Sequence, residues 1–122
     1  MKNILIVSLM LLTCMGILVA CGEQDKYNEA INDCIKQQKK LSLSFTTETE
    51  QKEMDRDKSV VKVYDDGKYV YVHFLSNDNE GFFKQKSDGS YDMGTYDDEE
   101  YMENDAKLVY YEKKGKLQTT QN

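Results

Sequence analysis

The 122-residue sequence predicts an α+β protein in which one long N-terminal helix packs on a four- to five-stranded antiparallel sheet. Two patterns carry this prediction. Apolar residues recur every three or four positions over residues 26–45, as in a helix with one apolar face. Beyond residue 59 the pattern changes to β-branched and aromatic runs separated by turn sequences. Consecutive hairpin strands form an antiparallel sheet, and the helix then covers one of its faces.

The first 20 residues differ from the rest of the chain. Lys2 precedes an apolar run over residues 4–20, and this order is typical of a secretory signal peptide. Residues 18–21 read Leu-Val-Ala-Cys, which resembles the lipobox of bacterial lipoproteins. The resemblance implies that residues 1–20 are cleaved and that the Cys21 thiol carries diacylglycerol, so that residues 21–25 form a short tether and the membrane is a partner. The alternative is a transmembrane helix, for which 17 residues is the lower limit of length.

The helical segment is predicted to contribute one face to the core. Residues 26–45 make about five turns, and Cys34 lies beside Ile31 and Ile35 on the apolar face, where a buried thiol acts as a small apolar side chain. The polar residues 46–58 either extend this helix or form a solvated linker, and the pattern does not separate these two alternatives.

The remaining elements are strands. They are predicted at residues 60–64, 68–75, 82–86, 91–95 and 107–113, and Asp-Asp-Gly at 65–67 joins the first two as a hairpin. Alternation puts Val70, Val72 and Phe74 on the face that meets the helix, and Tyr69, Tyr71, His73 and Leu75 on a partly solvated face. Residues 116–122 are predicted to be a disordered tail, so the folded domain spans residues 26–115.

Composition excludes several functions. The formal charge of −6 becomes −7 without residues 1–20, because Lys2 is the only charged residue there, and an acidic chain is a poor ligand for nucleic acid. No glycine-rich dinucleotide or phosphate-binding motif is present, and we expect no cofactor. The single histidine, His73, and Cys34 are too few for a zinc site, and we expect no metal. We expect no enzyme; a hydrolase that uses Cys34 and His73 is the least favoured alternative, because nothing nearby would activate the thiol.

The most biased segment lies between Lys86 and Lys107, where eight acidic residues and no basic ones occur. No frame fits a calcium loop of the EF-hand type, so a solvated loop or short helix is expected, and weak binding of divalent cations stays open. Tyr91, Tyr96 and Tyr101 interleave with the acids, and tyrosine is frequent at interfaces. We therefore expect a surface for a basic protein partner. Its candidate residues are Tyr96, Asp97, Asp98, Glu99, Glu100 and Tyr101.

The lipobox, the short tether, one amphipathic helix and the sequence KVYDDGKYV at residues 62–70 together resemble the cystatin-like fold lipoproteins of Gram-positive bacteria. The use of 15 Lys and one Arg, without Pro or Trp, also favours a low-GC Gram-positive source. The resemblance implies a cystatin-like fold on the outer face of the cell membrane and a link to conjugative or mobile elements. It does not imply protease inhibition, because residues 63–67 read VYDDG and lack the Q-x-V-x-G motif.

Two non-enzymatic functions therefore remain. The first is a lipid-anchored protein-interaction module at the cell envelope. The alternative is a module that binds a small molecule or peptide in the sheet face under the helix.

Overall fold

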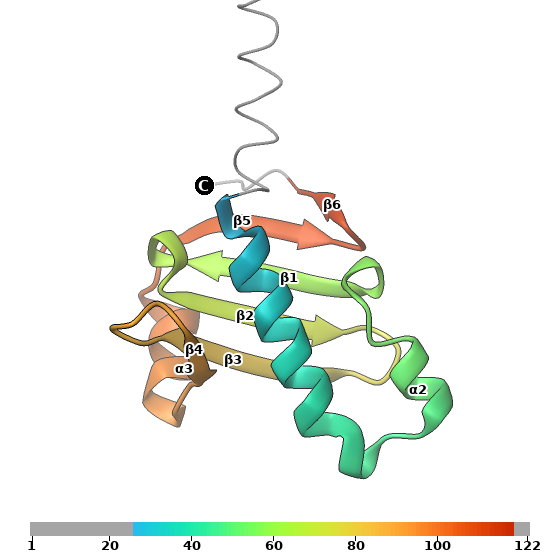
Figure 1. The fold of residues 1–122 in the computed structure, drawn as a ribbon. Coiled ribbons are helices and arrows are strands. Elements are labelled where there is room, and N and C mark those ends of the chain that lie inside the picture. The colour runs from blue at the N-terminus through green and yellow to red at the C-terminus, as the bar shows by residue number, and fades with distance from the viewer. Residues whose placement is uncertain (1–25, 119–122) are drawn as a thin grey trace, which may run out of the picture.

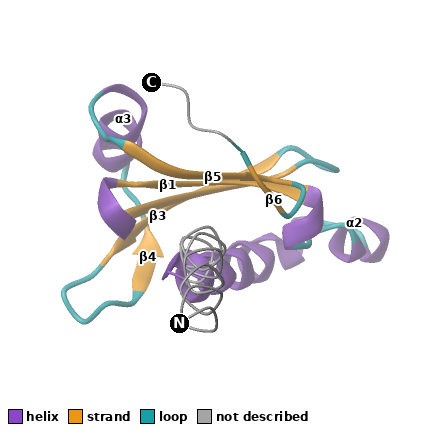
Figure 2. Cartoon of the chain, turned by 90° about the horizontal axis from the view of Figure 1, so that it is seen from above, coloured by secondary structure: helices purple, strands orange, loops and turns teal. Residues whose placement is uncertain are grey.

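The computed structural model describes residues 26–118, which form two layers. A helix over residues 26–42 crosses one face of a six-stranded antiparallel sheet (Figures 1 and 2). The α+β class and the helix-on-sheet arrangement are thus confirmed. The predicted signal peptide, the tether with Cys21 and residues 119–122 of the tail lie outside the described residues.

The elements follow the predicted order, with additions. After the helix come the 3-10 turn η1 (Leu43–Phe45), the short helix α2 (Glu48–Lys52) and the 3-10 turn η2 (Arg56–Lys58). The sheet and its connections consist of β1 (Ser59–Tyr64), η3 (Asp65–Gly67), β2 (Tyr69–Phe74), β3 (Asn79–Gln85), β4 (Tyr91–Met93), α3 (Tyr96–Asn104), β5 (Leu108–Lys113) and β6 (Lys116–Leu117). The spatial order is β4-β3-β2-β1-β5-β6, so β1 and β2 lie at the centre.

The core lies between the helix and the sheet. The helix buries a stripe with helical spacing: Tyr27, Ile31, Cys34, Ile35, Gln38 and Ser42. The sheet supplies Val61, Val63, Val70, Val72, Phe74 and Phe83, all 0% exposed. The prediction that the β-branched face meets the helix is confirmed, and so is the placement of Cys34 in the core. Within residues 26–118, these side chains pack against one another and fill the space between the helix and the central strands.

Gly81 brings the helix close to the sheet. The predicted third strand begins at residue 82, but β3 begins at Asn79 and contains Gly81. Gln38 lies over Gly81 and donates a hydrogen bond to the carbonyl oxygen of Glu80 at 3.0 Å. A Cβ on residue 81 would overlap the Gln38 side chain, so the absence of a side chain there allows this contact.

Residues 46–58 form neither a continuous helix nor a solvated linker. Met54 is fully buried, and Arg56 makes a bidentate ion pair with Glu112 of β5, with two N–O distances of 2.7 Å. Arg56 also donates to Asn28 and Asn32 of the helix. Through Arg56, this connection therefore ties the sheet, by the ion pair with the buried Glu112, to the helix, by two hydrogen bonds.

The chain past β5 continues the sheet. Lys114 and Gly115 both adopt positive φ angles, 53° and 77°, and turn the chain so that β6 pairs with β5. The prediction of a disordered tail from residue 116 is therefore wrong for Lys116 and Leu117. Backbone hydrogen bonds to β5 hold β6 in place, and a pattern of apolar residues does not predict such bonds.

Candidate protein-binding surface

The sheet face opposite the helix is open and aromatic. Tyr69, Tyr71 and His73 alternate with the core residues of β2 and are only half-buried. The strand register places Tyr71 opposite Phe82 of β3, with ring centroids 5.1 Å apart. Figure 2 shows that the long helix lies on the other side of the sheet, and among residues 26–118 α3 covers one end of this face. The predicted partial solvation of the tyrosine face is confirmed.

Lys62 lies among the rings of this face. Its Nζ is 5.7 Å from the ring centroid of Tyr71 and 5.2 Å from that of Tyr111, on the two neighbouring strands. A cation over two aromatic rings is attracted by their π-faces. The open face therefore combines half-buried aromatic rings with a charged side chain, unlike the apolar face under the helix.

The acidic segment forms the helix α3, one of the two outcomes expected for it. Thr95 and Asp98 form a capping box: the Thr95 N–H donates to Asp98 Oδ2 at 2.9 Å, and the Asp98 N–H donates to Thr95 Oγ1 at 3.3 Å. Acidic side chains in the first turn are also stabilised by the positive end of the helix dipole. Three of the acids, Asp97, Asp98 and Glu99, lie in this first turn, where a helix favours negative charge.

α3 packs on the aromatic face through its inward side. Met102 is buried there, 2% exposed, and the rings of Tyr101 and Tyr69 lie 5.3 Å apart. The Tyr101 hydroxyl donates to Asp65 Oδ2 at 2.6 Å, and the backbone N–H of Lys107 donates to Asp65 Oδ1 at 2.9 Å. Asp65 therefore anchors the C-terminal half of α3 and the residue that leads into β5.

The predicted partner residues divide into two groups. Tyr96, Asp97 and Glu100 are exposed, with Tyr96 at 77%, and Glu99 is half-buried. Asp98 and Tyr101 instead hold α3 in place. Hydrogen bonds from Thr95, with a smaller effect of nearby Lys84, lower the pKa of Asp98.

Tyr91 is not part of this surface. It belongs to β4, is 6% exposed on the helix side of the sheet, and donates to the carbonyl oxygen of Gly67. The sequence pattern grouped it with Tyr96 and Tyr101 because it could not show on which face β4 places its side chains.

A hollow of about 250 Å³ lies between α3 and the open face. It is lined by Lys62, Tyr64, Tyr71, Glu80, Phe82, Met102 and Glu103. Burial, followed by the charge of Glu80, raises the pKa of Tyr71 to about 12, so its hydroxyl stays protonated at neutral pH. The sequence pattern missed Glu80, Phe82 and Glu103 as site residues, because only the register of β2 with β3 and the packing of α3 bring them to Tyr71.

The turn between β1 and β2 connects this face with the helix side. Asp65, Asp66 and Gly67 have φ angles of 49°, 57° and 101°, and aspartate is among the few residues that tolerate this left-handed region. Asp66 accepts hydrogen bonds from Lys26 Nζ at 2.7 Å and from the Tyr27 hydroxyl at 2.9 Å. Asp65 accepts hydrogen bonds from α3 and the residue before β5, whereas Asp66 accepts hydrogen bonds from the start of the long helix. One turn therefore helps to position elements on both sides of the sheet.

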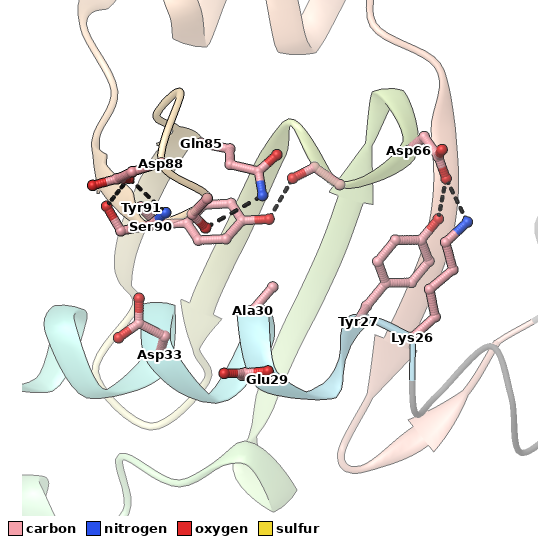
Figure 3. A pocket seen from close by; sticks show the side chains of 12 residues that line it. Lys26, Tyr27, Glu29, Ala30, Asp33, Asp66, Gln85, Asp88, Ser90 and Tyr91 are labelled. Carbon is pink, nitrogen blue, oxygen red and sulfur yellow. Dashed lines mark hydrogen bonds and ion pairs between the residues drawn. The ribbon is translucent and has the colours of Figure 1, made fainter.

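A second and larger hollow, about 610 Å³, lies beside the start of the helix (Figure 3). Lys26, Asp66, Gln85, Asp88 and Tyr91 are among the side chains around it. Glu29 and Asp33 of the helix also line it, so its carboxylates outnumber its one lysine. It lies at an edge of the core, not under the helix, where the alternative function expected a binding cavity.

Cys34 and His73 are not brought together. The Cys34 thiol is fully buried on the helix side, and burial raises its pKa further from neutrality. His73 lies on the opposite face of the sheet, where its Nε2 is 3.1 Å from Asp78 Oδ1. The sheet separates the two groups, so they form no catalytic dyad.

Two further properties concern residues 26–118 alone. No helix in this range has the length and apolar character needed to cross a bilayer. Within the same residues, no three histidine, cysteine or acidic side chains converge in a way that could hold a metal ion.

The fold and surface define a small α+β domain with one closed and one open sheet face. The chain is similar to the uncharacterised protein YddJ of Bacillus subtilis (strain 168), with 39% identity over 80 residues. The match covers 65% of this chain and 57% of YddJ, less than two thirds of that protein. No family model matches the chain, and no solved structure gives a significant match.

Proposed function

We propose that this chain is a lipid-anchored, non-enzymatic protein-interaction module at the cell envelope. The observation that carries the proposal is the open face of the sheet, where half-buried aromatic rings lie beside exposed acids of α3. Interfaces favour aromatic side chains, and charges at the rim steer a partner of opposite sign. The expected partner is therefore a protein with a basic surface.

The sequence supports the remaining parts of the proposal. The lipobox at residues 18–21 supports an acylated Cys21 and a position on the outer face of the membrane. One helix across an antiparallel sheet supports a cystatin-like fold. The resemblance to cystatin-like lipoproteins supports a role linked to a conjugative or mobile element, and a location of the gene within a transfer operon would be the corresponding genetic observation.

Site-specific photo-crosslinking in cells tests the partner surface. A photoreactive phenylalanine at position 96, on α3, should give a discrete crosslinked product, because Tyr96 is 77% exposed beside the open face. The same group at Leu117, exposed on the edge strand β6, is the matched control. Equal products from both positions, or a ladder of abundant membrane proteins from position 96, would refute a specific surface on α3.

Metabolic labelling tests the anchor separately. A fatty acid with an alkyne tag should label the chain, and Cys21→Ala should remove the label, because the thiol is the predicted attachment atom. Unchanged labelling of Cys21→Ala would refute the lipid anchor without affecting the partner surface.

The hollow of about 610 Å³ supports a second candidate, a module that binds a cationic small molecule or peptide. Asp88 at its rim is exposed, so Asp88→Asn should weaken binding of such a ligand without unfolding the domain. Calorimetric titration with a basic peptide measures this, with Asp97→Asn on α3 as the control of equal charge. Equal affinity of the two variants would exclude the hollow as the site.

A further inference from the structure

Three apolar side chains are exposed where the long helix ends. Leu41, Leu43 and Phe45 are 44%, 49% and 69% exposed, and Leu43 and Phe45 belong to the 3-10 turn η1. Single exposed apolar residues are common on protein surfaces, whereas these three lie within five positions of the chain.

The same part of the chain carries positive charge. Lys36, Lys39 and Lys40 lie in residues 34–47, which contain no acidic residue, although the chain as a whole has a charge of −6. Ile35 and Ser42 are buried on the side of the helix that packs against the sheet. Lys36 and Lys40 are exposed and project from the opposite side of the helix, away from the sheet. Within residues 26–118, no carboxylate lies within ion-pair distance of these three lysines, whereas Lys26, Lys58, Lys84 and Lys86 all have one.

We propose that residues 36–45 form a second contact with the membrane that carries the predicted lipid. Lysines around exposed leucine and phenylalanine are the combination by which peripheral segments bind the surface of an anionic bilayer. The lysines would pair with anionic headgroups, and Leu43 and Phe45 would enter the interfacial layer. The inference rests on the proposed lipid anchor, because three lysines and three apolar side chains make a weak contact unless a tether already holds the domain nearby.

The lengths of the chain allow both contacts at once. Residues 21–26 span at most about 17 Å, and a helix of 17 residues is about 25 Å long. With the lipid near one end and residues 36–45 at the other, the helix would lie along the membrane. The sheet separates the helix from α3 (Figure 2), so this orientation turns α3 and the open aromatic face away from the bilayer.

Tryptophan fluorescence tests the contact in the full, acylated chain, because the protein has no tryptophan of its own. Phe45→Trp reports on the segment, and Tyr96→Trp on α3 is the matched control, since both replace an exposed aromatic residue. The proteins are reconstituted in vesicles of phosphatidylcholine with or without phosphatidylglycerol. In the anionic vesicles, brominated lipid should quench Phe45→Trp at least about twofold more than Tyr96→Trp, and acrylamide should quench Phe45→Trp less.

The lysines give a second readout. Combining Phe45→Trp with Lys36→Gln, Lys39→Gln and Lys40→Gln should remove the difference between anionic and neutral vesicles. Equal quenching of Phe45→Trp and Tyr96→Trp in anionic vesicles would overturn the inference and leave the segment to a protein partner. Failure of the chain to float with neutral vesicles would instead refute the lipid anchor, so the two failures are distinguishable.

Discussion

Replacing Arg56 by methionine tests how much the ion pair between Arg56 and Glu112 contributes to the stability of the fold. Glu112 is 1% exposed, and its carboxylate accepts two hydrogen bonds from Arg56 and one from the Tyr110 hydroxyl at 2.6 Å. Burial acts to raise the pKa of Glu112, but the hydrogen bonds from Arg56 and Tyr110 outweigh it and lower the pKa from the ordinary value of 4.5. Without Arg56, burial dominates and the pKa of Glu112 rises.

The size of the effect follows from this pKa change. A buried carboxylate that loses its partner can avoid the cost of a buried charge by taking up a proton. Relative to the ordinary pKa of 4.5, protonation costs about 3.4 kcal/mol at pH 7 and about 0.7 kcal/mol at pH 5, at 1.36 kcal/mol per pH unit. Breaking a buried pair costs about 3–5 kcal/mol in other proteins. We therefore expect Arg56→Met to reduce the free energy of unfolding by about 3–5 kcal/mol at pH 7. At pH 5 the loss should be smaller by up to about 2.7 kcal/mol, which is the difference between the two protonation costs.

The ionised Glu112 carboxylate stabilises the wild type but destabilises the Arg56→Met variant, so acid has opposite effects on the two proteins. In the wild type, the lowered pKa of Glu112 stabilises the fold above pH 4.5, and this contribution is lost as the pH falls and the carboxylate is protonated. In the variant, the raised pKa destabilises the fold above pH 4.5, and acid relieves the penalty. Urea unfolding followed by far-UV circular dichroism at pH 5 and pH 7 measures both. Adding Glu112→Gln to Arg56→Met should recover about 2 kcal/mol at pH 7. A loss that is the same at both pH values would refute the reasoning.

Three further predictions address packing, the thiol and the turn. Gly81→Ala should destabilise the fold by about 2 kcal/mol, because the new Cβ would overlap Gln38 and lie 2.8 Å from Phe83; a urea midpoint equal to that of the wild type would contradict this. Cys34 should react with a thiol reagent only after unfolding, because it is 0% exposed; mass analysis of its peptide after native labelling measures this, and rapid modification would mean that the core opens easily. Asp65→Ala should speed hydrogen exchange in α3, which Asp65 anchors through a side-chain and a backbone hydrogen bond, while exchange in the helix over residues 26–42 should stay unchanged.

Local patterns were sufficient for most of the architecture. Spacing of three and four residues placed the helix, alternation in β2 identified the two faces, and Asp-Asp-Gly marked the first hairpin. These features depend on neighbours in sequence, so periodicity reports them directly. The short elements were not recoverable in this way, because β6 depends on pairing with β5 and the course of residues 46–58 depends on Arg56 reaching Glu112.

The candidate surface shows the same division. The acidic and tyrosine-rich segment was evident from composition, and its location on a solvated helix agrees with that pattern. Composition could not separate the exposed Tyr96 from the anchoring Tyr101 or the buried Tyr91, because the three differ only in what the fold places opposite them. Nor could it show that Cys34 and His73 lie on opposite sides of a sheet.

The sequence by itself determined the long helix, the five main strands, the acidic segment and the predicted lipidation site at Cys21, since each depends on consecutive or regularly spaced residues. Tertiary structure decided which sheet face stays open, which acids on α3 remain free, and how Arg56 joins two distant segments. The physical reason is that burial, strand register and ion pairing depend on contacts between residues far apart in the chain, and a linear pattern does not contain these contacts.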